Sequence, residues 1–288
     1  SNDASCPMFT NSGTFIKSGG NGVTDLRMEL HNSGIVEIRR GILNVGCGYI
    51  QTGGSTVVTG GNITGPIEVQ GGNIQGPISG NVTNTGEVSV PPSPTPPTTT
   101  SYTQTGLGSL TEQIGGLTPG LEYGQIQVSG DVNLAGSLFV TLINGFHPSV
   151  DDHFIIISKQ SGDPINGSFA GLPEDATLRD QVGNEYQISY IGGDGNDVTL
   201  TTIFVINGPP SADAGGPYAI NEGDSLTLNA AASDDADDDP LTYSWDVNGD
   251  GVVGDANGVS PTLTWAQLQA LGIDDGPATF AVAVQVDD

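Results

Sequence analysis

Short repeats in the first third of the sequence constrain its fold more than any other feature. The segment 9–15 is echoed by 30–36, twenty-one residues later, and 84–88 repeats part of it. The segment 60–67 recurs at 71–78, eleven residues on. A repeat of about 20 residues, with short strands and Asn-Gly or Gly-Gly corners, is typical of a right-handed parallel β-solenoid. Ordinary hairpins with Gly-rich turns are the alternative.

Composition extends the all-β prediction to the rest of the chain. Forty-four Gly and eighteen Pro, with many Thr, Ser and Asn, favour short strands joined by tight turns. A Pro/Thr-rich segment at 90–100 interrupts the pattern, either as an exposed linker or as a loop lying along the solenoid. Strand patterns that continue or cap the solenoid then cover 109–114, 123–128, 137–143, 154–158, 186–190 and 197–205. Helical patterning is confined to 264–271. In the solenoid, Asn side chains at fixed corners are expected to stack in a ladder.

Acidic residues gather toward the end of the sequence. The net charge is -27, and residues 206–288 carry fifteen Asp or Glu and no Lys or Arg. We expect two domains, a solenoid at 1–205 and a second domain at 206–288. Because phosphate groups are bound by Lys and Arg, this charge excludes nucleic acids and anionic membrane surfaces as partners. A surface of one sign repels itself and favours an extracellular setting with divalent cations.

The two cysteines, Cys6 and Cys47, leave the redox state open. A disulfide bond is expected in an oxidising compartment, and two buried free thiols are the alternative. No apolar run approaches the roughly 20 residues of a membrane span. Ser1 leads directly into a strand-like pattern without a signal peptide, so we expect the start to be a processed end within a longer secreted chain.

The segment from Asp246 to Gly251 has the spacing of a calcium loop. Asp246, Asn248 and Asp250 supply oxygen ligands at alternate positions, and Gly251 permits a sharp turn. A calcium ion bound by Asp246, Asn248, Asp250 and Asp255 is our prediction. Asn257 stands where an EF-hand loop has its bidentate Glu, so a complete EF-hand site is not expected. The alternative is a polar β-turn between strands.

Other segments carry weaker signals. The acidic run 234–239 is interpreted as a solvated loop or as a second cation site. The segment 192–200 matches one copy of a calcium β-roll repeat, but a lone copy is better explained as a hairpin turn. The three histidines show no metal-binding spacing, and no Gly-x-Ser-x-Gly or His-Glu-x-x-His motif occurs. Catalytic residues are therefore expected to be absent, and the protein is not expected to be an enzyme.

Several motifs follow one another in the acidic segment. They are Pro-Pro-Ser-Ala-Asp-Ala-Gly-Gly-Pro-Tyr at 209–218, Glu-Gly-Asp-Ser-Leu-Thr-Leu at 222–228, Asp-Pro-Leu-Thr-Tyr-Ser-Trp-Asp at 239–246 and Gly-Asp-Gly at 249–251. With them, residues 207–288 resemble the polycystic-kidney-disease (PKD) domain, an immunoglobulin-like β-sandwich common in bacterial surface proteins and secreted hydrolases. The family pattern has one more edge strand after Val286-Asp287-Asp288. The resemblance therefore implies a sandwich that lacks its last strand in this sequence.

The Asn-Ser-Gly-Thr and Gly-Gly-Asn-Ile repeats of 9–205 resemble the Gly-rich β-helix regions of autotransporter-like bacterial surface proteins. Neither resemblance implies an active site. Together they imply a fragment of a structural or adhesive protein, secreted or on the bacterial cell surface, with a solenoid rod and an acidic calcium-binding spacer. Expected partners are further copies, neighbouring surface proteins or extracellular glycan. A carbohydrate-binding accessory region of a secreted hydrolase is the alternative, and a β-helix polysaccharide lyase is a third interpretation.

Overall fold

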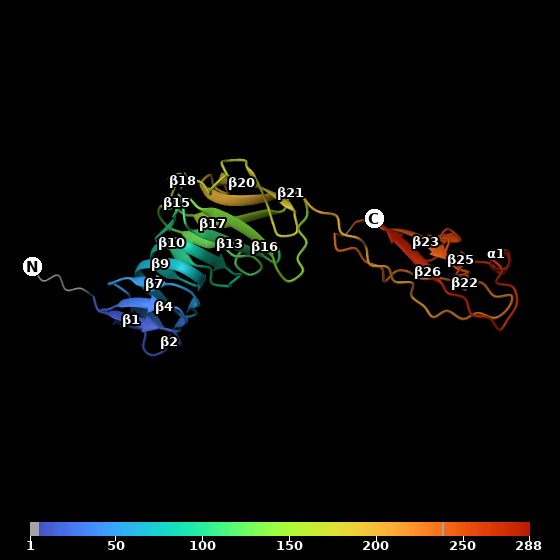
Figure 1. Cartoon of the computed structure of the whole chain (residues 1–288), viewed down its shortest axis with the longest axis horizontal. Helices are drawn as coiled ribbons and strands as arrows, with labels where there is room; N and C mark the ends of the chain where they lie inside the picture. Colours follow the sequence, from blue (N-terminus) through green and yellow to red (C-terminus); the bar gives the residue numbers. More distant parts are fainter. Residues whose placement is uncertain (1–5, 238) are drawn as a thin grey trace, which may run out of the picture. The chain divides into compact units, whose positions relative to one another are not determined.

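A computed structural model describes the chain over residues 6–237 and 239–288. The chain divides into two compact units, residues 1–206 (unit 1) and residues 207–288 (unit 2), and each has its own hydrophobic core. Figure 1 labels many of their strands and the helix α1 (Trp265–Ala270). In the described part of the chain α1 is the one α-helix, and strands form most of the remaining regular structure. The all-β class is confirmed.

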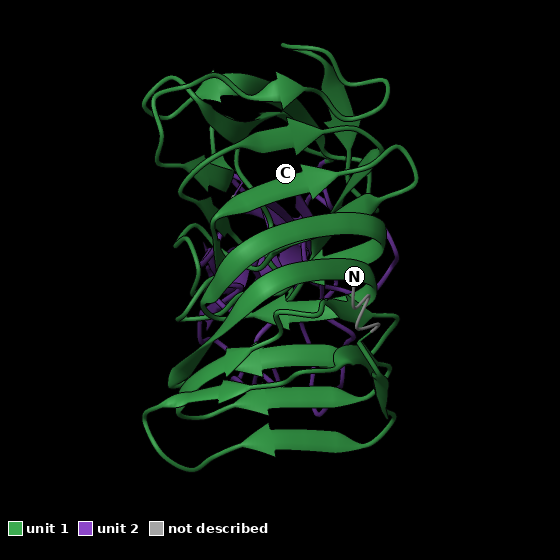
Figure 2. Cartoon of the chain, turned by 90° about the vertical axis from the view of Figure 1, so that its left-hand side faces the viewer, with its two compact units in different colours: residues 1–206 green, residues 207–288 purple. Residues whose placement is uncertain are grey.

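Unit 1 begins with successive passes of short strands that pair in parallel (Figure 2). The first pass contains β1 (Met8–Asn11), β2 (Thr14–Lys17) and β3 (Val23–Asp25), and the second contains β4 (Glu29–Asn32), β5 (Ile35–Ile38) and β6 (Gly41–Asn44). The third contains β7 (Tyr49–Gln51) and β8 (Ser55–Val58). The stacks run β1–β4–β7, β2–β5–β8 and β3–β6, and β9 (Gly61–Gln75) pairs with β6, β7 and β8. The repeated segments 9–15 and 30–36 therefore lie beside one another, with Phe9 opposite Leu30 and Phe15 opposite Val36.

The same parallel pairing continues beyond β9. The next strands of the unit are β10 (Ile78–Val90), β12 (Ser101–Gln104), β13 (Ser109–Ile114), β15 (Val132–Leu134), β16 (Ser137–Leu142) and β18 (Asn166–Gly167). One series runs β9–β10–β12–β15–β18, and another runs β10–β13–β16. With β1 to β9 they make a 15-stranded sheet within the described residues. A large parallel sheet, as opposed to a chain of hairpins, is thus the dominant feature of unit 1.

A second sheet changes from parallel to antiparallel pairing. Its order is β11 (Thr98–Thr99), β14 (Ile126–Val128), β17 (His153–Lys159), β21 (Asp197–Phe204), β20 (Glu185–Gly192) and β19 (Thr177–Arg179). The pairs β11–β14 and β14–β17 are parallel, whereas β17–β21, β21–β20 and β20–β19 are antiparallel. The strands expected between residues 109 and 205 are present, with shifted ends at several of them.

The core of unit 1 is built from columns of side chains in matching registers. One apolar column contains Leu30, Tyr49, Ile67, Val82, Tyr102 and Val132, and each is buried. Strand alternation sends these side chains to one face, and parallel pairing stacks them on one another. Each pass therefore completes the burial of the pass before it.

A polar column runs beside the apolar one. Its registered positions are Asn11, Asn32, Gln51, Val69, Asn84 and Gln104. Asn11 Nδ2 donates to Asn32 Oδ1 at 2.7 Å, and Asn84 Nδ2 donates to Gln104 Oε1 at 3.2 Å. Asn32 Nδ2 also donates to the hydroxyl of Tyr49 at 3.0 Å. The expected ladder of corner Asn side chains is present between Asn11 and Asn32. Val69 interrupts the column.

The Pro/Thr-rich segment lies against unit 1. Ser93 and Thr99 are buried, and the amide of Ser93 donates to the carbonyl of Gly120. Farther along, the amide of Gln127 donates to the carbonyl of Pro97 at 2.8 Å. Of the two alternatives, a loop along the sheet describes this segment and an exposed linker does not.

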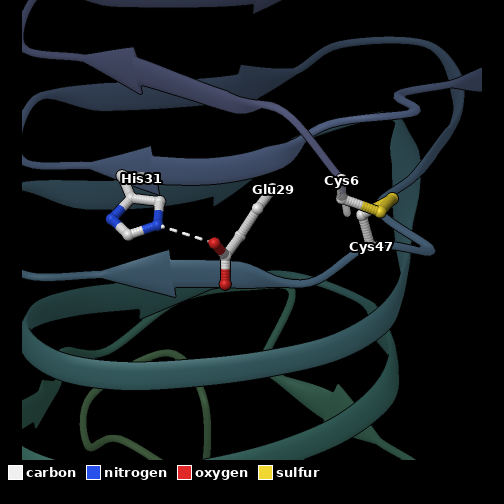
Figure 3. The surroundings of a disulfide bond; sticks show 4 residues. All are labelled: Cys6, Glu29, His31 and Cys47. Atoms are coloured by element: carbon white, nitrogen blue, oxygen red, sulfur yellow. Dashed lines mark ion pairs between the residues drawn. A yellow bond between two sulfur atoms is a disulfide. The ribbon is translucent and has the colours of Figure 1, made fainter. Parts of the chain in front are cut away.

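Cys6 and Cys47 form a disulfide bond, with their Cα atoms 6.0 Å apart (Figure 3). The bond joins the segment before β1 to the corner after β6. The sequence had left this pairing open. Disulfides persist in oxidising compartments, which agrees with an extracellular protein.

Unit 2 consists of two small antiparallel sheets around one core. In one sheet β22 (Leu226–Thr227) pairs with β25 (Thr262–Leu263). In the other, β23 (Thr242–Asp246) lies between β24 (Ala256–Asn257) and β26 (Ala283–Asp287). Their core contains Leu226, Leu228, Trp245, Val247, Leu263 and Leu268. Trp245 is fully buried, and its Nε1 donates to the carbonyl of Gly258 at 2.9 Å.

Helix α1 begins and ends close to the predicted positions. The amide of Thr264, its N-cap residue, donates to Gln267 Oε1 at 2.9 Å. This contact satisfies an amide at the start of the helix. Gly272, with φ of +80°, follows the last turn, a conformation that suits glycine.

Candidate metal centre

The predicted calcium loop connects β23 to β24. Asp246 ends β23 and is 5% exposed. Its Oδ1 accepts the amide of Gly249 and its Oδ2 accepts the amide of Gly251, both at 2.8 Å. Gly249 and Gly251 have φ of +74° and +85°. The carboxylate of Asp246 therefore stabilises a tight turn that depends on glycine at two positions.

The other three predicted ligands also accept amides of this loop. Asn248 Oδ1 accepts the amide of Asp250 at 3.0 Å, and Asp250 Oδ1 accepts the amide of Val252 at 2.8 Å. Asp255 Oδ2 accepts the amide of Val247 at 2.8 Å. Asn248 Nδ2 donates to the carbonyl of Leu271 at 3.3 Å, which joins the loop to the residue after α1.

These contacts bring Asp246, Asn248, Asp250 and Asp255 into one loop and orient an oxygen of each toward the backbone. Carboxylate and amide oxygens have two lone pairs, so an oxygen that accepts one amide can also bind a cation. The loop has the hard oxygen donors that calcium requires. The same hydrogen bonds also describe a polar turn, so calcium at these four residues stays a prediction.

Of the acidic run 234–239, Asp238 lies outside the described residues, and Asp235 and Asp237 take part in a turn. Asp234 exchanges two backbone hydrogen bonds with Ser211. Asp235 Oδ1 accepts the amides of Asp237 and Asp239 at 2.8 and 3.3 Å, and Asp237 Oδ2 accepts the amide of Gly208 at 2.6 Å. One oxygen of Asp235 therefore organises the turn, and one oxygen of Asp237 joins it to Gly208.

The β-roll-like segment is a hairpin turn. β20 and β21 are antiparallel, with Gly192 opposite Asp197. Asp197 Oδ1 accepts the amide of Lys159 at 2.7 Å, and burial raises the pKa of Asp197. The hairpin interpretation of residues 192–200 is confirmed.

Two histidines and two carboxylates of unit 1 lie in separate small pairs. His31 Nε2 lies 3.1 Å from Glu29 Oε2 (Figure 3), and His153 Nδ1 lies 3.0 Å from the hydroxyl of Thr201. Arg39 Nε donates to Glu37 Oε1 at 2.6 Å on the exposed surface. The hydrogen bond from Arg39 lowers the pKa of Glu37, and the positive charge of Arg39 adds to this effect.

The two most deeply buried ionisable side chains of unit 1, apart from tyrosines, were not singled out from the sequence. Glu112 is fully buried in β13, and Lys159 is 1% exposed at the end of β17. Lys159 Nζ donates to the carbonyls of Ser161 and Asp163 and to the hydroxyl of Ser161. Side chains alternate between the two faces of a strand, so Glu112 lies on the same face as Leu110 and Ile114. This alternation in the sequence could have identified Glu112 as an inward-facing residue.

Comparison with known protein families supports the resemblance inferred from the motifs of unit 2. Residues 207–268 match the PKD domain family. Unit 2 is therefore called the PKD unit below. PKD domains are common in extracellular surface and adhesion proteins. The comparison gives no family support for the autotransporter-like resemblance of unit 1. No curated protein and no solved structure matches the chain. None of its described helical segments has the length and hydropathy of a membrane span.

Proposed function

We propose that this protein is an extracellular structural component of a bacterial surface, in which unit 1 is a solenoid rod and the PKD unit is an acidic spacer. The observation that carries the proposal is the stacking of repeat on repeat in unit 1, because a solenoid is stiff along its stacking direction. The PKD match and the Cys6–Cys47 disulfide support an extracellular location.

Calcium has a mechanical role in this proposal. The PKD unit carries fifteen acidic residues without a Lys or Arg, so its surfaces repel one another. Calcium at Asp246, Asn248, Asp250 and Asp255 would lower that charge and hold the loop between β23 and β24. Divalent cations would also allow the acidic surfaces of neighbouring copies to approach. The protein acts as a support and a contact surface, without catalysis, and its partners are further copies or neighbouring surface proteins.

Electron microscopy of the full chain tests this proposal. Samples in calcium and after chelation are compared for wild type, for the Asp246→Asn/Asp250→Asn variant and for Asp274→Asn, an exposed control in the same unit. We expect ordered fibres or lattices in calcium that loosen on chelation, with the loop variant resembling chelated wild type. Isolated particles under every condition would reject the self-assembling support.

A groove in the PKD unit favours a second candidate, a glycan-binding module. The groove has a volume of about 720 Å³ and is lined by Tyr218, Trp265 and Phe280, with Asn221 and Glu222 among its polar groups. Aromatic faces beside hydrogen-bonding groups suit the apolar and polar faces of a sugar ring. On a glycan array, saturable binding to one polysaccharide that Trp265→Ala removes would favour this module over the support.

A further inference from the structure

Three carboxylates from separate parts of the PKD unit converge near one end of the β23–β26 ladder. Oxygen atoms of Asp235, Asp239 and Asp288 all lie within 4.8 Å of one another. Asp235 and Asp239 belong to the turn before β23, whereas Asp288 directly follows β26. Like charges this close repel one another unless a cation or a proton lies between them.

Asp235 supplies an independent indication of a ligand. Its side chain is 5% exposed, and its Oδ1 accepts the amides of Asp237 and Asp239. The other oxygen, Oδ2, is buried and has no hydrogen-bond partner in the described part of the chain. Buried polar atoms are nearly always paired, since an unpaired one loses its hydration without compensation. A bound cation would provide the missing interaction.

We propose that Asp235, Asp239 and Asp288 form a divalent-cation site, and that calcium is its ion. Carboxylate oxygens are hard ligands, which suit calcium better than the softer transition metals. Calcium accepts six to eight oxygens in flexible geometry, so backbone carbonyls and water can complete the shell. The PKD unit has no Lys or Arg that would compete for these carboxylates.

This site is distinct from the loop at Asp246. In the ladder, Thr242 pairs with Asp287 and Asp246 pairs with Ala283. The four residue steps of β23 between these pairs span about 13 Å, at roughly 3.3 Å a step. Two ions, one near each end of the ladder, are therefore compatible, and neither shares a carboxylate with the other.

The ion would join segments that are distant in the sequence. Asn207 Nδ2 donates to Asp288 Oδ2 at 2.7 Å, and the amide of Gly208 donates to Asp237 Oδ2 at 2.6 Å. The start of the PKD unit, the acidic turn and the end of β26 thus meet around the three carboxylates. Calcium would hold these three segments together and stabilise the folded unit through its binding free energy.

Titration calorimetry of calcium into the chelated full chain tests the site. The variants are Asp235→Asn, Asp288→Asn and the control Asp274→Asn, which removes the same charge from an exposed position. We expect wild type and the control to bind calcium at this site with the same affinity. In Asp235→Asn and Asp288→Asn, the affinity of that binding event should fall on the order of tenfold or more. An event at the loop would remain in both and be lost in Asp250→Asn.

Tryptophan emission, to which buried Trp245 contributes, shows whether the PKD unit of each variant is folded. Asp288 is exposed, so its substitution tests the site even if Asp235→Asn unfolds the unit. Calcium binding by folded Asp288→Asn with wild-type stoichiometry and affinity would overturn the proposal, as would the absence of millimolar calcium binding by wild type. Calorimetry reports on the dissolved chain, so these outcomes do not depend on whether copies assemble.

Discussion

Glu112 is a carboxyl group inside an apolar core. It lies on β13 between Leu110 and Ile114, whose side chains are buried on the same face. Neither carboxylate oxygen makes a hydrogen bond of regular geometry in the described part of the chain, and the nearby amide of Gly124 offsets the loss of hydration only in part. Burial raises the pKa of Glu112 well above its usual value of 4.5, because the charged form loses its hydration. The folded protein therefore keeps this side chain protonated at a pH where the unfolded chain has released the proton.

The pKa of Glu112 predicts a pH-dependent loss of stability. Since the folded pKa exceeds the unfolded one, the free energy of unfolding falls as pH rises from about 4.5 toward the folded pKa. Relative to wild type, Glu112→Gln should be little changed at pH 4 and more stable at pH 7, by more than about 1 kcal/mol. Urea denaturation followed by circular dichroism at both pH values measures this difference.

Glu87→Gln is the matched control for that experiment, because Glu87 is exposed on the neighbouring strand β10. Its stability difference from wild type should stay the same at the two pH values. A Glu112→Gln difference that is equally independent of pH would show that Glu112 is not protonated in the folded protein.

At the scale of elements, the first two passes of unit 1 depend on neighbours for their stability. Strands β1 to β3 are short, and each forms its ladder with one strand of the second pass. The polar column also stabilises the contact between these two passes. At its start, the buried side-chain amide of Asn11 donates to the side-chain oxygen of Asn32 in the next pass. The disulfide from Cys6 to Cys47 closes a chain segment across both passes.

Loss of the disulfide should loosen these passes first. Cys47→Ser is expected to lower stability by about 4 kcal/mol, the chain-entropy value for closing a loop of this length. Hydrogen exchange should increase most in residues 8–44, which hold β1 to β6. Cys6→Ser should give the same effect, and the double variant should add nothing, because both changes remove one bond. Equal exchange in oxidised and reduced wild type would contradict this role.

At the scale of the whole molecule, the two units have cores of different character. Unit 1 is built on parallel ladders and side-chain columns, whereas the PKD unit has short antiparallel strands around Trp245. Both tryptophans, Trp245 and Trp265, belong to the PKD unit. Tryptophan fluorescence therefore reports on that unit, while backbone circular dichroism is dominated by the larger unit 1.

Calcium should stabilise the PKD unit selectively. At a hundredfold excess over its dissociation constant, one bound ion adds about 2.7 kcal/mol to the free energy of unfolding. For a unit of this size, that raises the melting temperature by roughly 10 °C or more. We expect the fluorescence-detected midpoint to rise in calcium and fall on chelation, with little change in the transition of unit 1. An unchanged fluorescence midpoint would contradict calcium binding at either acidic site.

Local patterns in the sequence determined the strand-rich class, the ladder of Asn11 and Asn32, the helix at α1 and the PKD family of the acidic segment. Each of these features depends on residues that are close together in the sequence or on a sequence repeat. The spacing of apolar residues and the residue types at turns are therefore sufficient to predict it. Alternation was also enough to place Glu112 inside, although that residue was not recognised.

Other features were decided only by the tertiary structure. A β-bulge between Ile155 and Ile157 shifts the alternation of β17 and turns Lys159 inward, which a strict period of two does not predict. The disulfide required the register of the first two passes. Asp235, Asp239 and Asp288 meet because β23 pairs with β26 across a long stretch of sequence. Such proximities depend on which strands pair and in which register, and those choices are made by packing of the whole core.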